Sequence, residues 1–225
     1  MASPLPITVL FEDACLLVLD KPDGLLSVPG RGEDKQDCLS ARAQAIYPDA
    51  LVVHRLDMAT SGLMLMARGI TMHRVLSKAF ADRLVHKRYV AVVDGQLATP
   101  PDAWAVIDLP IALDWPRRPL RIIDETLGKP STTKWRVAAS QNPVNAKDFE
   151  PGSPSTRLEL EPVTGRSHQL RVHLAAIGHP ILGDRLYAPL EVQQRASRLM
   201  LHASALALAH PHSGAMMQFS NPPPF

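Results

Sequence analysis

Residues 53–69, VHRLDMATSGLMLMARG, place a histidine, an arginine and an aspartate directly before a run of apolar residues. The run 62-GLMLMA-67 is typical of a buried strand. A carboxylate at the mouth of such a strand stays ionised despite desolvation if arginines lie within reach, as a nucleophile or general base requires. The same spacing suits a structural ion pair or a capped turn, and the segment alone favours this simpler interpretation.

The composition is that of an ordinary globular chain. Its 225 residues are 46% hydrophobic and 20% charged, and 21 prolines favour loops and turns over a helical bundle. No apolar run is long enough to cross a bilayer, and the N-terminus does not resemble a secretory signal. Cys15 and Cys38 form no metal-binding spacing, so we expect both to be buried and reduced in the cytoplasm. The net charge of +2 leaves nucleic-acid binding open.

The hydrophobic pattern predicts many strands with few helices between them. Helices are expected over 37–47, 70–85, 167–178 and, in short form, 190–198. Strands are expected in a hairpin over 7–22 and over 62–67, 88–95, 103–111, 132–140, 156–163, 199–210 and 215–220. Since only some strand pairs have a helix between them, we expect an α+β fold with a mixed, largely antiparallel sheet. No linker divides the chain, so we expect a single domain over residues 1–225.

A second polar cluster lies in 164-TGRSHQLRVHL-174. On a helix, His168 and Arg171 share one face, whereas Leu170 and Leu174 share another. Arg171 is then presented away from the core stripe, near the helix start, where it could reach a carboxylate from another segment.

The histidines of this region do not have the spacing of a zinc protease. His168, His173 and His179 are separated by four and five residues, and no glutamate accompanies them as in H-E-x-x-H. We therefore expect structural roles for them and no metal site. The absence of Walker A, G-x-G-x-x-G and G-x-S-x-G motifs gives nucleotide-driven chemistry and a serine nucleophile no support.

Two further segments are candidates for RNA contact. On the strand 87-KRYVAVV-93, Tyr89 shares a face with Lys87, and an aromatic with basic neighbours can stack on a base or simply fill the core. The loop 115-WPRRPLR-121 holds three arginines and no acid. It is a reasonable phosphate contact, although exposed arginines are also ordinary surface.

Several longer segments follow one another in a recognisable order: VLDKPDGLLSVPGR, VHRLDMATSGLMLMAR, KRYVAVVDG, LDWPRRP, KPSTTKWRV, TGRSHQLRVHLAAIGHPILGDRLYA and RLMLHA. Together they resemble the RluA family of RNA pseudouridine synthases over nearly the whole chain, in the short, dual-specificity form without an S4 domain. The HRLD-x-x-TSG and GRSHQLRVH motifs are specific. The resemblance implies the pseudouridine synthase fold, isomerisation of uridine to pseudouridine in structured RNA, and no cofactor, metal or energy source.

The resemblance also implies roles for individual residues. Asp57 would be the essential aspartate, Arg171 its ionic partner, and Tyr89 would lie against the uracil ring. Arg55 would fill the space left by the flipped uridine, and Leu201 would pack under the uracil. Phosphate contacts would come from the basic residues Lys87, Arg88, Arg117, Arg118 and Arg166.

The implied substrates are stem-loops: the first uridine of the anticodon loop of some tRNAs and a loop uridine of 23S rRNA, read largely by shape. We expect a monomer with no obligate protein partner and no membrane association. One alternative is a non-catalytic RNA-binding or ribosome-assembly module on the same fold, which would bind a stem-loop without forming pseudouridine. Another is a metal-dependent hydrolase that uses His54, Asp57 and His168 and is inactive in chelator. His54 otherwise has no assigned role.

Overall fold

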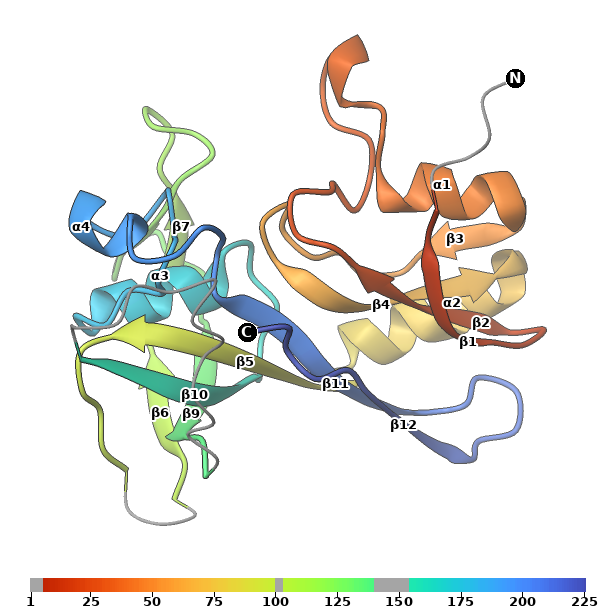
Figure 1. The fold of residues 1–225 in the computed structure, drawn as a ribbon. Helices are drawn as coiled ribbons and strands as arrows, with labels where there is room; N and C mark the ends of the chain where they lie inside the picture. The colour runs from red at the N-terminus through yellow and green to blue at the C-terminus, as the bar shows by residue number, and fades with distance from the viewer. Residues whose placement is uncertain (1–5, 100–102, 140–153) are drawn as a thin grey trace. The chain divides into compact units, whose positions relative to one another are not determined.

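The computed structural model describes residues 6–99, 103–139 and 154–225 (Figure 1). The chain forms two compact units. Unit 1 comprises Met1–Lys87 and Ala203–Pro223, and unit 2 comprises Arg88–His202 and Pro224–Phe225. A single catalytic domain over 1–225 stays a prediction.

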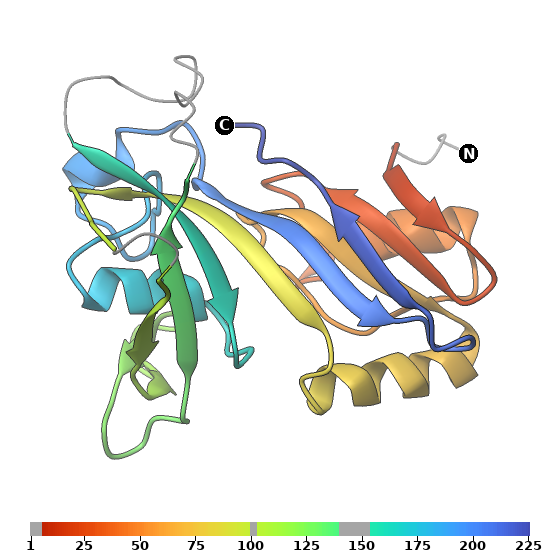
Figure 2. The same ribbon diagram turned by 90° about the horizontal axis from the view of Figure 1, so that it is seen from below.

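The strands of unit 1 surround β4 (Ser61–Arg68), the strand expected at 62–67. The order is β1-β2-β4-β11, with β3 also paired to β4 and β12 paired to β11. Figures 1 and 2 both show β12 alongside β11, antiparallel to it. The bounds of these strands are β1 (Thr8–Glu12), β2 (Leu16–Lys21), β3 (Ala50–Val52), β11 (Leu201–Ala209) and β12 (Met216–Ser220).

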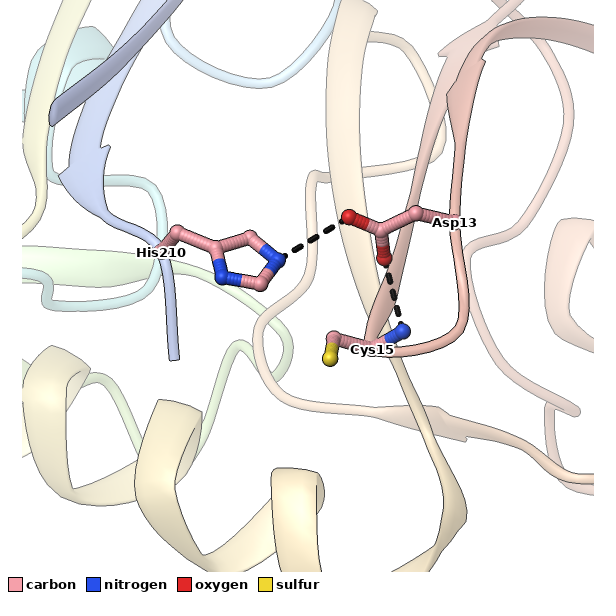
Figure 3. Close-up of side chains that lie close together, drawn as sticks. All are labelled: Asp13, Cys15 and His210. Atoms are coloured by element: carbon pink, nitrogen blue, oxygen red, sulfur yellow. Dashed lines mark hydrogen bonds and ion pairs between the residues drawn. The ribbon is translucent and has the colours of Figure 1, made fainter. Parts of the chain in front are cut away.

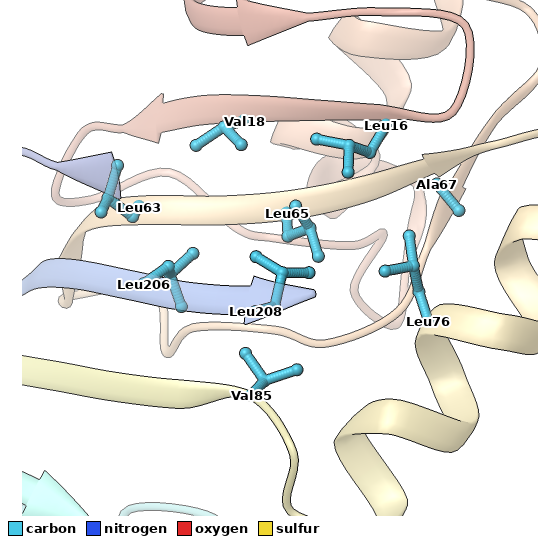
Figure 4. Close-up of a cluster of buried hydrophobic side chains, with 9 residues drawn as sticks. All are labelled: Leu16, Val18, Leu63, Leu65, Ala67, Leu76, Val85, Leu206 and Leu208. Carbon is cyan, nitrogen blue, oxygen red and sulfur yellow. The ribbon is translucent and has the colours of Figure 1, made fainter. Parts of the chain in front are cut away.

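Strand β4 is buried on both faces because each face has its own hydrophobic cluster. Leu63 and Leu65 lie in one cluster, which includes Leu76 of the helix α2 (Gly69–Ala81) (Figure 4). Met64 and Met66 lie in a second cluster, which includes residues of the helix α1 (Leu39–Ile46). Successive side chains of a strand point to opposite faces, so burial on both faces explains why the run 62–67 contains no polar residue.

The helix expected over 70–85 is correct in kind but ends at Ala81. Arg83 adopts a left-handed backbone with φ of 61°, and its N–H donates to Phe80 O (3.2 Å) while that of Leu84 donates to Ala79 O (2.9 Å). This pair of bonds is a Schellman motif, which terminates a helix by satisfying its last carbonyl groups. Leu84, which the expected helix over 70–85 would include, lies beyond its end and is 62% exposed.

Unit 2 contains the strand order β5-β10-β9-β6 and a separate β7-β8 pair. The pairings whose registers are given are antiparallel in both units, which agrees with the expected α+β fold. None of the helices in the described ranges combines the length and apolar character needed to span a membrane. The elements are β5 (His86–Asp94), β6 (Ala105–Asp108), β7 (Ile111–Leu113), β8 (Arg121–Ile123), β9 (Thr132–Val137), β10 (Ser155–Pro162), α3 (Gln169–Ala176) and α4 (Leu190–Gln193), with the 3-10 turn η1 (Glu33–Lys35) in unit 1.

Candidate active site

Asp57 lies in a turn that leads into β4. The Thr60 N–H donates to Asp57 O at 3.0 Å and closes the turn. Next to this turn, the fully buried Lys21 donates its ammonium to Met58 O at 3.0 Å and to the carbonyls of Pro22 and Leu25 at 2.8 and 2.7 Å. Carbonyl dipoles therefore compensate a buried charge, and the same charge fixes the backbone next to Asp57.

The residue before Asp57 is fixed by a second buried side chain. The Ser27 hydroxyl donates to Leu56 O (2.7 Å) and accepts the Leu56 N–H (3.1 Å). Leu56 is itself buried, whereas Arg55 is exposed and Asp57 is half-buried. Leu56 therefore anchors the segment, and the two polar neighbours are left at the surface.

The glycine of the T-S-G motif is required by a close approach of two strands. Gly62 has φ of 108°, and a Cβ there would lie 2.3 Å from the Ala203 carbonyl oxygen on β11. No other residue fits this position without moving one of the strands. Gly62 thus allows β11 to lie directly against the start of β4.

His54, which the sequence left without a role, is a structural residue. Its Nε2 accepts the Leu65 N–H at 2.8 Å, and its ring stacks on Phe80 at a centroid distance of 4.5 Å. Burial, and secondarily the Lys87 charge, lowers the pKa of His54 from 6.5 to about 3. The imidazole is neutral at physiological pH, and its Nε2 lone pair is occupied, so it is a poor metal ligand for the hydrolase alternative.

In unit 2, Arg171 reaches a carboxylate of another segment, as its position on the helix indicated, but that carboxylate is Asp184 and the pair is buried. Only 4% of Arg171 is exposed, because α3 is buried on almost every side. Its Nε donates to Asp184 Oδ2 at 2.8 Å and its Nη2 to Asp184 Oδ1 at 2.6 Å. This bidentate ion pair compensates the buried guanidinium. The pairing of Arg171 with Asp57 stays a prediction.

Asp184 and Tyr187 are residues that the sequence patterns did not single out, although both stand in the quoted GDRLYA segment. Asp184 Oδ1 also accepts the N–H groups of Leu186 (2.9 Å) and Tyr187 (3.3 Å). The Tyr187 ring lies 5.1 Å from the Arg171 guanidinium. The Tyr187 hydroxyl accepts the Arg121 N–H at 3.0 Å and lies 2.6 Å from His168 Nδ1. Arg171 is therefore held on two sides by one short segment.

The histidines near α3 have the structural roles predicted for them. Buried His173 bonds to Thr133 Oγ1 and to the Leu109 carbonyl, each at 2.9 Å, and burial lowers its pKa. His179 Nδ1 donates to the Asp94 carbonyl at 2.8 Å. Each ring is thus satisfied by neighbouring groups of unit 2.

The other predicted base-contacting residues lie on strands. Tyr89 is half-buried on β5, opposite Leu160 of β10. Leu201, at the start of β11, is 3% exposed. Arg88 is exposed, with its guanidinium 5.8 Å from the Trp104 ring. The contacts of Tyr89 and Leu201 with a uracil stay predictions.

The predicted phosphate contacts differ in exposure. Arg117, Arg118 and Arg166 are exposed, and Arg166 is close to the Pro130 carbonyl, with Nε 3.4 Å away. Lys87, which belongs to unit 1, is half-buried, and burial followed by the charge of Arg83 lowers its pKa. The three arginines are therefore better placed than Lys87 for contact with a phosphate.

Asp13, Cys15 and His210 form the one group in the described ranges with ligand atoms close enough to suggest a metal site (Figure 3). However, His210 Nδ1 accepts the Ser213 N–H at 3.0 Å, so the ring proton is on Nε2, which donates to Asp13 Oδ2 at 3.0 Å. Metal ligation through Nε2 would need that proton on Nδ1 instead. The cluster is therefore a hydrogen-bonded link between two turns.

The pKa values of this cluster agree with that interpretation. Burial raises the pKa of Asp13, but the N–H groups of Cys15 and Leu16 and the contact with His210 outweigh it and lower the pKa. Burial and the Asp13 charge raise the pKa of the Cys15 thiol, which disfavours the thiolate that a metal needs. Cys15 is half-buried, not fully buried as expected, whereas Cys38 is buried.

Comparison with known proteins identifies the family. The family model described as RNA pseudouridylate synthase matches residues 15–176. The chain belongs to the RNA pseudouridylate synthase family. It is 44% identical over 221 residues to the dual-specificity RNA pseudouridine synthase RluA of Escherichia coli (strain K12), covering 97% of this chain and 94% of that protein. It is 47% identical over 205 residues to the RluA protein of Vibrio parahaemolyticus, covering 91% and 78%.

Solved structures agree with this assignment. Human RNA pseudouridylate synthase domain containing 1 superposes with a TM-score of 0.78 at 27% identity, covering 100% of this chain and 86% of that one. Human RNA pseudouridylate synthase domain containing 4 gives 0.69 at 25% identity, covering 96% and 88%. The expected family, fold and isomerase class are confirmed, and the non-catalytic alternative gains no support. The roles of individual residues in this pseudouridine synthase stay predictions.

The low pKa of His54 predicts a specific loss of stability in acid. His54 is protonated near pH 6.5 in the unfolded chain but only near pH 3 in the folded chain. The contribution of neutral His54 to the free energy of unfolding is therefore complete above pH 6.5 and is lost as pH falls. Between pH 7 and pH 5, the free energy of unfolding of the wild type should fall by about 2 kcal/mol more than that of His54→Gln. Denaturant unfolding at both pH values measures this. The exposed His212→Gln variant serves as control, and identical pH dependence in wild type and His54→Gln would refute the prediction.

The buried Arg171–Asp184 pair predicts that stability and activity can be separated. Asp184→Asn and Arg171→Met should each lower the free energy of unfolding by about 3–5 kcal/mol, because each leaves a buried partner uncompensated. The double variant Arg171→Met/Asp184→Leu should recover much of this stability but not the activity. Unfolding curves and single-turnover pseudouridine formation measure the two properties. A stable double variant with wild-type activity would show that Arg171 has only a structural role.

Proposed function

We propose that this enzyme isomerises uridine to pseudouridine in stem-loops of both tRNA and 23S rRNA, acting as a cytoplasmic monomer. Its similarity to dual-specificity RluA proteins over nearly the full length of both chains supports the double substrate range. The observation that carries the proposal is the turn at Asp57. Lys21 and Ser27 fix the backbone on both sides of a half-buried carboxylate, as expected for a group that must meet its substrate in one geometry.

We propose Asp57 as the residue that reacts with the nucleotide. The reaction breaks the bond between the sugar and the base nitrogen and forms one to a ring carbon, so uridine supplies every atom of the product. The nucleotide must leave the base stack to be reached. Exposed Arg55, two residues from Asp57, is suited to occupy the vacated space, while Arg171 is the ionic partner of the carboxylate and Tyr89 and Leu201 hold the uracil.

Two different RNAs can share one site if the enzyme reads the shape of a stem-loop and only a few of its bases. The exposed arginines of unit 2, Arg88, Arg117, Arg118 and Arg166, supply phosphate contacts that do not depend on base sequence. Lys87 contributes less, because it is half-buried. The free thiols of Cys15 and Cys38 are compatible with a reducing cytoplasm.

The proposed reaction predicts that Asp57→Asn abolishes pseudouridine formation while stem-loop binding is retained, because the amide keeps the shape but loses the reactive oxygen. Three strains are compared, which carry the wild-type gene, the Asp57→Asn gene or no gene. Mapping pseudouridine in the tRNA and the 23S rRNA of each strain tests both targets. Both RNAs should lose one modification in the last two strains. Activity in the Asn variant would refute the role of Asp57, and loss from only one RNA would refute dual specificity.

Phosphate contact by the arginine loop predicts a change in salt dependence. Arg117→Gln/Arg118→Gln should weaken stem-loop binding and reduce the slope of log K against log salt by roughly 0.7–0.9 for each phosphate that the loop no longer neutralises. Binding titrations at several salt concentrations measure the slope. Arg74→Gln removes an exposed charge from α2 and should leave the slope unchanged. An unchanged slope in the double variant would place the loop away from the RNA.

A further inference from the structure

Trp115 is the one aromatic residue among the highly exposed large apolar side chains of the described ranges, with 66% of its surface exposed. It lies in the loop 114–120 that joins β7 to β8. A single exposed apolar residue is ordinary on a protein surface. The surroundings of Trp115 are what distinguish it.

The loop that carries Trp115 is held in one conformation by a buried carboxylate. Asp114 is 5% exposed, and its Oδ1 accepts the Arg117 N–H at 3.2 Å while its Oδ2 accepts Arg117 Nε at 2.7 Å. The backbone closes with Asp114 N–H to Leu120 O (3.1 Å) and Leu120 N–H to Arg117 O (3.0 Å). The indole is therefore exposed on an ordered loop, so little conformational entropy is lost when it binds a ligand.

An arginine already stacks on the indole. The Arg118 guanidinium lies 4.8 Å from the centroid of the Trp115 ring. Arg117 is 70% exposed, although its Nε is engaged by Asp114. The loop thus presents a flat aromatic surface beside two cationic groups, and the acid nearest to them in sequence is turned into the protein. A base attached to phosphates has the complementary flat surface and the complementary charge.

The strand that follows this loop, β8, is connected to Arg171 within unit 2. The first residue of β8, Arg121, donates its N–H to the Tyr187 hydroxyl at 3.0 Å. The Tyr187 ring lies 5.1 Å from the Arg171 guanidinium. A nucleotide bound by the loop would therefore be held by the same scaffold that holds a proposed active-site residue.

We propose that Trp115 stacks on an unpaired base of the RNA, next to the target uridine in the stem-loop, while Arg117 and Arg118 hold the adjoining phosphates. This inference rests on the proposed function, because it names a nucleotide subsite of the same substrate. The stacking contact differs from the phosphate contacts because it is aromatic, is restricted to unpaired bases and does not depend on salt.

The test compares two replacements of the indole. Trp115→Leu keeps an apolar side chain without a flat aromatic face, and Trp115→Phe keeps the aromatic face. The full chain is titrated with a synthetic RNA hairpin that has an unpaired loop and with a fully paired duplex of the same stem. Trp115→Leu should raise the Kd for the hairpin about ten-fold, with an unchanged salt slope and unchanged duplex binding, whereas Trp115→Phe should retain most of the affinity.

Fluorescence provides a second measurement. Stacking on a base should quench the emission of Trp115, so the hairpin should quench wild type more than Trp115→Phe, which retains Trp104 and Trp135. Met216→Ala is the matched control, because Met216 on β12 is 65% exposed and should not affect RNA binding.

A wild-type Kd for Trp115→Leu, or an equal rise in Kd in the Leu and Phe variants, would overturn the inference. Normal RNA binding by Trp115→Leu combined with a change in sedimentation would assign the loop to a protein contact and overturn it as well. If wild type forms no pseudouridine but Trp115→Leu still loses affinity for the hairpin, the proposed function fails and the stacking inference stands. If pseudouridine forms and Trp115→Leu binds normally, only the stacking inference fails.

Discussion

The burial of β4 on both faces is the constraint on which the rest of unit 1 depends. The strand needs one helix against each face, and α1 and α2 supply them. It also needs close neighbours at its edges, which Gly62 permits where β11 approaches. A strand so tightly surrounded cannot shift by one residue, because a shift would exchange the two faces. The turn that begins β4 therefore inherits a fixed position, and Asp57 lies in that turn.

Two buried cations, Lys21 and Arg171, fix different parts of the protein. Lys21 donates to three backbone carbonyl oxygens, so its charge fixes the path of the chain around Asp57. Arg171 is paired with a carboxylate in a planar, bidentate contact, so Asp184 fixes the orientation of a guanidinium. The first arrangement positions a backbone, and the second positions a side chain.

Sequence patterns predicted the fold where long, regular segments determined it. The run 62–67 was recognisable as a continuous apolar stretch, and the helices beginning near 39 and 69 were recognisable because their periodicity extends over several residues. The early end of α2 was not, since it depends on Arg83 adopting a left-handed backbone, which arginine rarely does. The strands β3 and β8 have three residues each, too few to show a period.

The burial of Arg171, which helical spacing did not predict, has a physical cause of the same kind. Helical periodicity assumes that one face of a helix meets solvent, but α3 has only eight residues and is buried on almost every side. A charged residue at a position predicted to be polar was therefore inside the protein, with a partner thirteen residues away that periodicity cannot identify. His54 is the converse case, because sequence patterns assigned this polar residue of the HRLD motif no role outside the hydrolase alternative. Its contacts with Leu65 and Phe80 show that it supports the strand instead. In both cases tertiary packing determined the role, and only the three-dimensional structure contains that information.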